Sequence, residues 1–86
     1  MEKIFDDAAL DAMMFWAHHS RKTLDKIYKL IRDVERNGMS AGEGKPEKLK
    51  HHPGWSRRID KENRLIYSMD EQGFLHILSC KGHYEE

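Results

Sequence analysis

The apolar pattern of this chain changes its period near Gly38, and that change constrains the fold more than any other feature. Before Gly38, apolar side chains recur at helical spacing in residues 6–19 and 21–36. After it, residues 55–60, 64–69 and 74–80 have the composition and turn-rich flanks of short strands. Two helices followed by consecutive strands predict an α+β fold, with both helices packed on a small twisted antiparallel sheet.

Each predicted helix carries one apolar stripe. In residues 6–19 the stripe is Leu10, Met13, Met14 and Ala17, and in residues 21–36 it is Leu24, Ile27, Tyr28, Ile31 and Val34. Asp6 or Asp7 can cap the first helix, and Asn37-Gly38 is a typical helix stop. Only Ser20 separates the two segments, which predicts an antiparallel helix hairpin.

Successive side chains of a strand point to opposite faces of a sheet, so the strands can be divided into faces. Trp55, Arg57 and Ile59 share one face, and Arg58 falls on the other. Helices covering the apolar face would leave Arg58 and Arg64 together on the open face. Residues 74–80 are apolar on both sides and leave their orientation undecided, and residues 3–5 are candidates for a fourth strand.

Size and composition exclude several classes of protein. Eighty-six residues predict a single domain over residues 1–86. Cys80 is the one cysteine, which rules out an intrachain disulfide and agrees with a reducing, cytoplasmic location. No window approaches the roughly 20 apolar residues of a membrane span. A core this small leaves room for a stabilising partner, and an exposed Trp16 or Phe15 would be compatible with a homodimer.

The charge is neutral overall but uneven along the chain. Fifteen basic residues balance fifteen acidic ones. Between Lys45 and Arg64, however, seven basic residues face three acidic ones, so positive charge gathers beside the predicted open face. Such a patch suits phosphate oxygens, which arginine binds in a bidentate manner. An ordinary solvated sheet face is the alternative interpretation of the same charges.

A small set of side chains could carry out chemistry without a cofactor. Glu47, Arg58, Arg64, His83 and Tyr84 come from a loop, the open face and the C-terminal end. A carboxylate, a histidine and arginines suffice for RNA cleavage, because one group removes the 2′-hydroxyl proton, another protonates the leaving oxygen, and guanidinium charge stabilises the phosphorane.

Other kinds of site find less support. The six histidines are not spaced as a ligand set, so we expect no metal. The glycines of residues 38–45 lack the spacing of a phosphate-binding loop. A nucleophilic pair of Cys80 and His83 is less plausible than an inert buried cysteine.

Four stretches, taken in order, resemble the YoeB/Txe toxins of bacterial toxin–antitoxin modules. They are residues 43–51 (EGKPEKLKH), 54–59 (GWSRRI), 62–67 (ENRLIY) and 80–84 (CKGHY). The resemblance implies a RelE-like, microbial-ribonuclease-type fold. It also implies a ribosome-dependent endoribonuclease that cuts messenger RNA in the A site and is neutralised by a cognate YefM/Axe-like antitoxin.

The same resemblance implies roles for individual residues. Glu47 would be the general base and His83 the general acid, with Arg64 stabilising the scissile phosphate and Tyr84 stacking on a base. The residues expected to place the RNA are basic: Lys45, Lys50, Arg57 and Arg58.

The chain departs from the family in three ways. Glu85 and Glu86 extend past the terminal His-Tyr pair, residues 51–55 are one residue shorter than in some relatives, and the net charge is zero rather than positive. Two alternatives therefore stay open beside the ribonuclease: a non-catalytic RNA- or ribosome-binding module on the same fold, and a protein-binding module with a cationic face.

Overall fold

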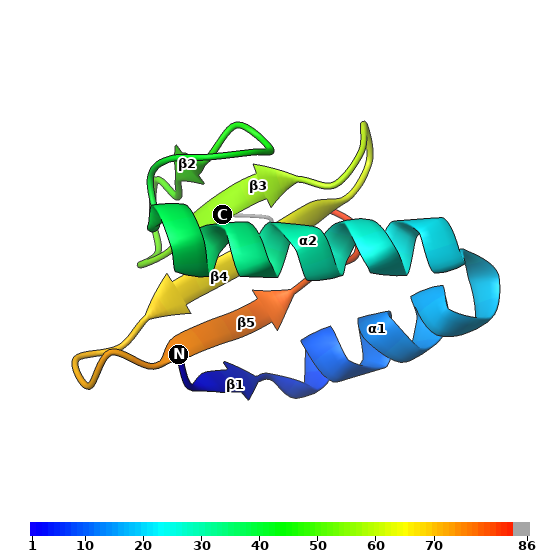
Figure 1. Ribbon diagram of the computed structural model, residues 1–86, viewed down its shortest axis with the longest axis horizontal. Helices are drawn as coiled ribbons and strands as arrows, with labels where there is room; N and C mark the ends of the chain where they lie inside the picture. The colour runs from blue at the N-terminus through cyan, green and yellow to red at the C-terminus, as the bar shows by residue number, and fades with distance from the viewer. Residues whose placement is uncertain (84–86) are drawn as a thin grey trace.

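The computed structural model describes residues 1–83, which form two helices and a five-stranded sheet (Figure 1). In chain order the elements are β1 (Lys3–Phe5), α1 (Asp7–His19), α2 (Arg21–Asn37), β2 (Glu47–Lys48), β3 (Trp55–Arg58), β4 (Arg64–Met69) and β5 (Leu75–Ser79). The α+β class and the helix hairpin are confirmed. None of the helices in this part of the chain is long and apolar enough to cross a membrane.

The sheet is mixed rather than purely antiparallel, which corrects the prediction. Its strand order is β1-β5-β4-β3-β2. The pairs from β2 to β5 are antiparallel, whereas β1 runs parallel to β5, with Ile4 opposite His76. Residues 3–5 do form the suggested extra strand. The sequence did not reveal β2, because two exposed residues are too few for an alternating pattern.

Helix α2 buries three of the five predicted stripe residues, Ile27, Ile31 and Val34, together with Leu30, which the predicted stripe did not include. Its buried side chains Ile27, Leu30, Ile31 and Val34 meet apolar residues of β4 and β5 in one core. Ser20 accepts a hydrogen bond from the Thr23 N–H (3.2 Å) and caps the start. Gly38 ends the helix with a φ of 90°, a conformation that glycine adopts without steric cost. One expected stripe residue, Tyr28, is 61% exposed.

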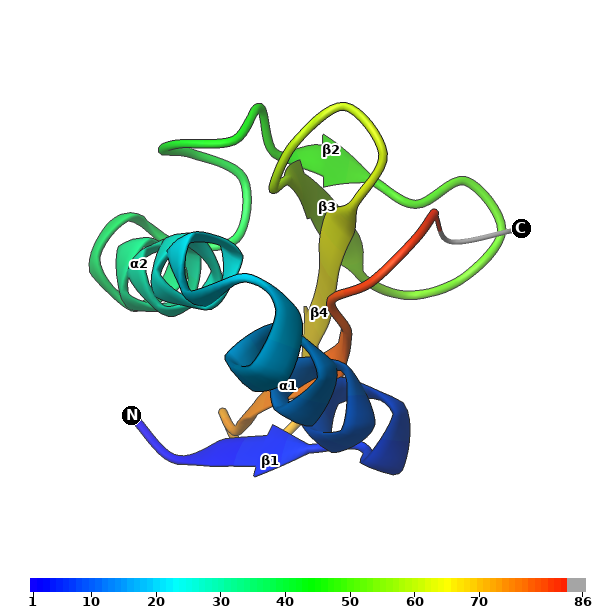
Figure 2. The same ribbon diagram turned by 90° about the vertical axis from the view of Figure 1, so that its right-hand side faces the viewer.

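Helix α1 buries a different face from the one predicted. Ala9 and Ala12 are in the core, whereas Leu10 and Met14 are 51% and 62% exposed. The helix lies over β5 and β1 at the edge of the sheet, as Figure 2 shows, and small side chains allow this close approach. Trp16 is not a free surface residue either, since it packs against the core and its indole donates to the Cys80 carbonyl (3.0 Å).

Candidate active site

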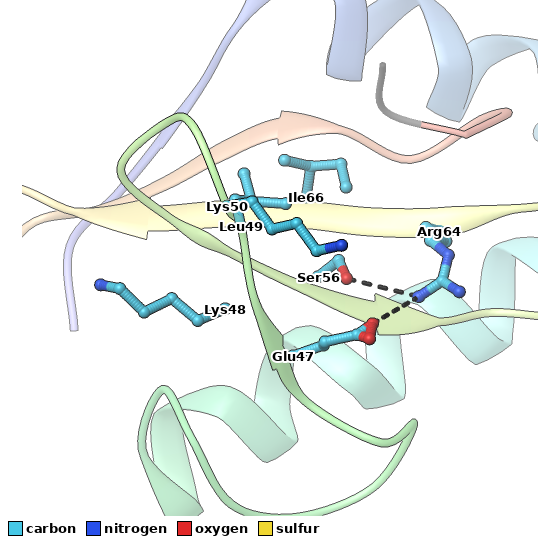
Figure 3. A pocket seen from close by; sticks show the side chains of 7 residues that line it. All are labelled: Glu47, Lys48, Leu49, Lys50, Ser56, Arg64 and Ile66. Atoms are coloured by element: carbon cyan, nitrogen blue, oxygen red, sulfur yellow. Dashed lines mark hydrogen bonds and ion pairs between the residues drawn. The ribbon is translucent and has the colours of Figure 1, made fainter. Parts of the chain in front are cut away.

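A pocket of about 270 Å³ lies on the face of the sheet opposite the helices (Figure 3). Its walls come from three strands, β2, β3 and β4, and from residues 49–50, which directly follow β2. The lining residues are Glu47, Lys48, Leu49, Lys50, Ser56, Arg64 and Ile66. Glu47, Arg64 and Lys50 were all predicted from the sequence as site residues, and the structure brings them to this one pocket.

Glu47 and Arg64 are brought together by strand register. Glu47 lies opposite Ser56 in the β2–β3 pair, and Ser56 lies opposite Ile66 in the β3–β4 pair, so one row crosses three strands. From β4, Arg64 Nη1 reaches to 3.9 Å from Glu47 Oε1 and donates to Ser56 Oγ at 3.4 Å. The Glu47 side chain is 66% exposed, so its carboxylate is open to a ligand as well as to Arg64.

A second arginine lies directly beside this pair. Arg58 and Arg64 are register partners across β3 and β4, and Arg58 is exposed. The predicted meeting of these two residues on the open face is therefore confirmed. Like charges directly opposite each other in a sheet repel, and a bound anion relieves the repulsion. This position is thus suited to a phosphate.

The two predicted lysines take different places. Lys50 points into the pocket toward Ser56, as Figure 3 shows. Lys45 is exposed in the preceding loop and is not one of the pocket-lining residues. Its φ of 54° is left-handed, a conformation that is unfavourable for a residue with a Cβ atom. The surrounding loop must therefore hold Lys45 in place.

His83 is tied to the start of β4 through the backbone of its neighbour. The Gly82 carbonyl accepts from the Arg64 N–H (3.0 Å), and the Gly82 N–H donates to Asn63 Oδ1 (2.8 Å). His83 itself is exposed. Burial alone would raise the pKa of Asp60, but hydrogen bonds from Asn63 and Glu62 and the positive charge of His83 together lower it. The Gly82 backbone thus holds the chain at His83 next to the strand end that carries Arg64, although His83 is not one of the pocket-lining residues.

Tyr84 and the Glu85–Glu86 pair lie outside the described residues. The predicted base-stacking role of Tyr84 therefore stays a prediction.

Arg57 does not belong to this surface, which corrects its assignment to RNA binding. Its side chain has no exposed area. Alternation in β3 places it on the helix side of the sheet, the face that it shares with Trp55. Because no surface of the guanidinium is accessible, Arg57 cannot contact a phosphate.

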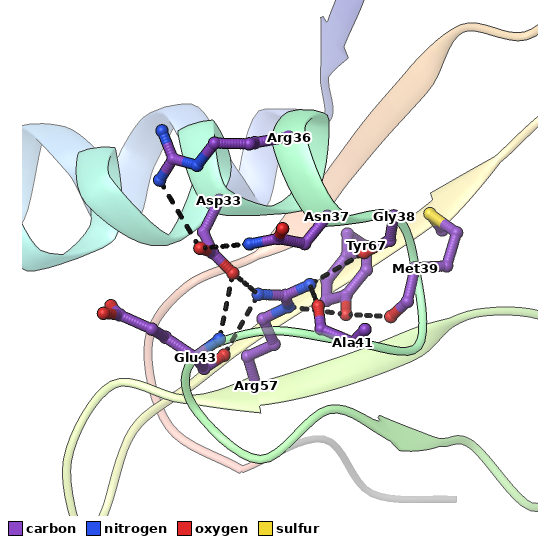
Figure 4. A network of polar contacts seen from close by, with 9 residues as sticks. All are labelled: Asp33, Arg36, Asn37, Gly38, Met39, Ala41, Glu43, Arg57 and Tyr67. Atoms are coloured by element: carbon purple, nitrogen blue, oxygen red, sulfur yellow. Dashed lines mark hydrogen bonds and ion pairs between the residues drawn. The ribbon is translucent and has the colours of Figure 1, made fainter.

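The guanidinium of Arg57 instead lies at the centre of a polar network (Figure 4). It is ion-paired with Asp33 Oδ2 of α2, and its Nε donates to the Tyr67 hydroxyl (2.9 Å). The backbone N–H of Glu43 and the Arg57 guanidinium, more than offsetting burial, lower the pKa of Asp33. Burial raises the pKa of Tyr67 despite the neighbouring Arg57 charge. Asp33 is therefore an ionised partner for a buried cation.

The sequence analysis missed Asp33, Tyr67 and Ser56 as residues that support the site. One signal was present, because Asp33 adjoins the apolar stripe of α2 and Arg57 shares the apolar face of β3. Two opposite charges on facing apolar surfaces indicate a buried pair. The hydroxyls of Tyr67 and Ser56 gave no comparable signal.

Cys80 is unsuited to nucleophilic chemistry. Its side chain is fully buried, and burial raises its pKa to about 11. Within residues 1–83, no three His, Cys, Asp or Glu side chains are grouped to hold a metal ion. Among the described residues, the candidate catalytic groups are the carboxylate of Glu47, the guanidinium of Arg64 and the imidazole of His83. Together they can accept a proton, stabilise an anion and donate a proton.

The chain matches the sequence profile of a family described as "YoeB-like toxin of bacterial type II toxin-antitoxin system" over residues 5–84. It is 37% identical to "Toxin YoeB" of Escherichia coli strain K12 over 86 residues, which cover 98% of this chain and 100% of the relative. The match extends from the first strand to the end of the site, so it includes every candidate residue.

Solved structures of similar proteins agree. A YoeB/ParE toxin from Agrobacterium tumefaciens superposes with a TM-score of 0.91 at 34% identity, covering 98% of this chain and 100% of that one. A toxin from Staphylococcus aureus, solved in a heterotetrameric YoeB-YefM complex, superposes with a TM-score of 0.87 at 37% identity, with 98% of each chain covered. The same toxin as a YoeB dimer gives 0.89 with the same identity and coverage.

Proposed function

The chain belongs to the YoeB-like toxins of bacterial type II toxin–antitoxin systems, and from this membership we propose that it is a ribosome-dependent endoribonuclease. In this proposal it cleaves messenger RNA in the ribosomal A site and thereby stops translation in the cytoplasm. The observation that carries the proposal is the exposed Glu47 carboxylate beside the Arg64 guanidinium in an open, basic pocket.

The proposed reaction is an internal transesterification that needs no metal. Glu47 removes the proton of a 2′-hydroxyl, and the 2′-oxygen attacks the adjacent phosphorus. The bond from phosphorus to the 5′-oxygen breaks, and His83 gives that oxygen a proton. Arg64 stabilises the negative charge of the phosphorane between these two steps. Histidine suits the acid role because its ordinary pKa, near 6.5, is close to physiological pH.

Basic residues around the pocket would place the substrate. Arg58 and Lys50 lie beside Arg64 and Glu47, where they can bind phosphates on either side of the scissile one. Lys45 extends the positive surface along the loop that leads to β2. Tyr84 would stack on a nucleobase, a contact that any base can make.

The partners are also part of the proposal. A relative with 37% identity is found with YefM and as a dimer in solved structures. We therefore propose that a YefM-like antitoxin neutralises this chain and that two copies form a homodimer. The exposed Phe15, Leu10 and Met14 of α1 offer apolar surface for contacts of this kind.

The decisive experiment is messenger RNA cleavage in a reconstituted bacterial translation reaction. Wild type, Glu47→Ala and His83→Ala are compared, each with and without ribosomes, and ribosome binding is measured by co-sedimentation. We expect cuts only with ribosomes and only in wild type, while all three proteins bind ribosomes. Binding without cleavage by wild type would favour a non-catalytic RNA-binding module instead. Equal loss of binding and cleavage in the variants would contradict the catalytic roles.

A further inference from the structure

We propose that Arg57 is a positioning residue, whose buried guanidinium shapes residues 38–46 so that Glu47 and Lys45 are presented to the open face. The effect on cleavage rests on the proposed ribonuclease function, whereas the effect on the loop does not. Arg57 would act from the opposite side of the sheet and would never touch the RNA.

The hydrogen bonds of Arg57 account for every donor that it has. A guanidinium carries five N–H groups. One donates to the Tyr67 hydroxyl and one to Asp33. The other three donate to backbone carbonyls of the loop: Gly38 (2.8 Å), Ala41 (2.5 Å) and Glu43 (3.0 Å). The loop thus wraps around the Arg57 guanidinium, which is not accessible to solvent.

The partners of Arg57 bind the same loop. Tyr67 donates its hydroxyl hydrogen to the Met39 carbonyl (2.7 Å), and Asp33 Oδ2 accepts from the Glu43 N–H (2.9 Å). Residues 38–46 contain no helix or strand in which these backbone carbonyls could find partners. The three side chains therefore replace the hydrogen bonds that secondary structure would otherwise supply.

Two glycines show how closely the loop fits. A Cβ atom on Gly42 would lie 2.0 Å from Asp33 Oδ2, and one on Gly44 would lie 3.0 Å from Arg57 Cβ. Both residues also have positive φ angles, of 112° and 83°. Any side chain at Gly42 would displace the Arg57–Asp33 pair, so the fit is specific to this arrangement.

The loop transmits this geometry directly to the site. The Gly44 carbonyl accepts from the Arg58 N–H (2.7 Å), and the left-handed Lys45 follows. Glu47 then enters the β2–β3 pair opposite Ser56. The Arg57 contacts end at Glu43, four residues before Glu47, so a shift in the loop moves both the carboxylate and the Lys45 ammonium.

A substitution of Arg57 by lysine tests this role. Arg57→Lys keeps a positive charge for Asp33 but has three donors on a single nitrogen instead of a planar fork. Arg21→Lys is the matched control, since Arg21 is 81% exposed at the far end of α2. Tyr67→Phe is a milder second variant, because it removes only the hydroxyl that joins Arg57 to Met39. Circular dichroism selects the variants that are folded at the assay temperature.

Two readouts are needed: amide hydrogen exchange of residues 39–45, and the kcat and KM for cleavage on programmed ribosomes. For Arg57→Lys and Tyr67→Phe we expect at least tenfold faster exchange in the loop and at least a tenfold lower kcat. KM should change less than kcat, because Arg58 and Arg64 are held by the β3–β4 pair and, among the proposed phosphate-binding residues, Lys45 is the one that moves with the loop. Arg21→Lys should match wild type.

Unchanged loop exchange in both folded variants would overturn the proposal. So would faster exchange with a wild-type kcat, which would show a purely structural role. If wild type itself does not cleave, the ribonuclease proposal fails, while the exchange data still decide whether Arg57 orders the loop.

Discussion

Arg57 and Arg58 are consecutive residues of β3, yet the first has no exposed surface and the second faces solvent beside Arg64. Adjacent residues of a strand point to opposite faces, so one motif supplies two different surfaces. Arg57 joins α2 to the loop that precedes β2, and Arg58 adds charge to the pocket. Substitutions of these two neighbours should therefore have different consequences.

Glu47→Gln should abolish cleavage while leaving the fold and the ribosome affinity nearly unchanged. The amide is similar in size to the carboxylate but cannot accept the 2′-hydroxyl proton. Loss of a general base lowers a rate by about 10²- to 10⁴-fold. The measurement is the single-turnover cleavage rate on programmed ribosomes.

Glu71→Gln is the matched control for this variant, because Glu71 is an exposed residue in the β4–β5 turn, outside the pocket. It should cleave at the wild-type rate. Near-normal cleavage by Glu47→Gln would contradict the role of Glu47 as general base and would mean that another group accepts the 2′-hydroxyl proton.

Arg58→Ala should weaken ribosome binding in a way that depends on salt. The slope of log affinity against log salt is negative, and each lost phosphate contact makes it shallower by about 1. Ribosome affinity is measured by co-sedimentation across a salt series for wild type, Arg58→Ala and Arg21→Ala. The Arg21 variant should keep the wild-type slope. An unchanged slope in Arg58→Ala would mean that Arg58 makes no phosphate contact.

Periodicity predicted the parts of this fold whose packing is local to one element. The ends of α2 follow from Ser20 and Gly38, and the shared face of Arg58 and Arg64 follows from alternation. The buried face of α1 could not be predicted in this way. Ala9 and Ala12 are buried because α1 lies close to the sheet edge, where only small side chains fit. That position depends on the pairing of β1 with β5, a contact between residues distant in sequence.

The candidate site shows the same division. Glu47 and Arg64 were predicted as site residues, but their approach depends on β2, which is too short to be predicted. Arg57 was assigned to RNA because it is basic and lies in a basic segment, although alternation placed it with Trp55. Charge along the sequence does not distinguish a surface cation from a buried one, whereas the position of Asp33 on the facing helix does.

Cys80 should be unreactive in the native protein. Burial raises its pKa to about 11, so little thiolate is present near neutral pH, and the sulfur is also inaccessible. Alkylation by iodoacetamide at mildly alkaline pH should be at least about 10²-fold slower in native buffer than in concentrated urea. Rapid native alkylation would instead indicate that the β5 end opens readily.

Arg57→Leu should destabilise the fold by about 3–5 kcal/mol, because it leaves the Asp33 carboxylate buried without its cation. Urea unfolding followed by circular dichroism measures the loss. Arg21→Leu removes an exposed ion pair and should change the free energy of unfolding by no more than about 0.5 kcal/mol.

The double variant Arg57→Leu with Asp33→Leu separates the buried charge from the lost hydrogen bonds. It should be more stable than Arg57→Leu alone, since no unpaired charge remains. A double variant less stable than the single one would show that the hydrogen bonds Asp33 accepts from the Glu43 N–H and from Asn37 outweigh the cost of its unpaired charge.

The stability contributed by Asp33 should disappear in acid. Hydrogen bonds from the Glu43 N–H and from Arg57 lower the pKa of Asp33 in the folded state, so its carboxylate stabilises the fold above the unfolded-state pKa of about 3.9. This contribution is lost as the pH falls through the lower, folded-state pKa. Asp33→Asn keeps an oxygen for Glu43 but has no charge to titrate. The difference in free energy of unfolding between wild type and Asp33→Asn should therefore be largest near pH 7 and should shrink below about pH 4. A difference that does not change with pH would mean that Asp33 is not the ionised partner of Arg57.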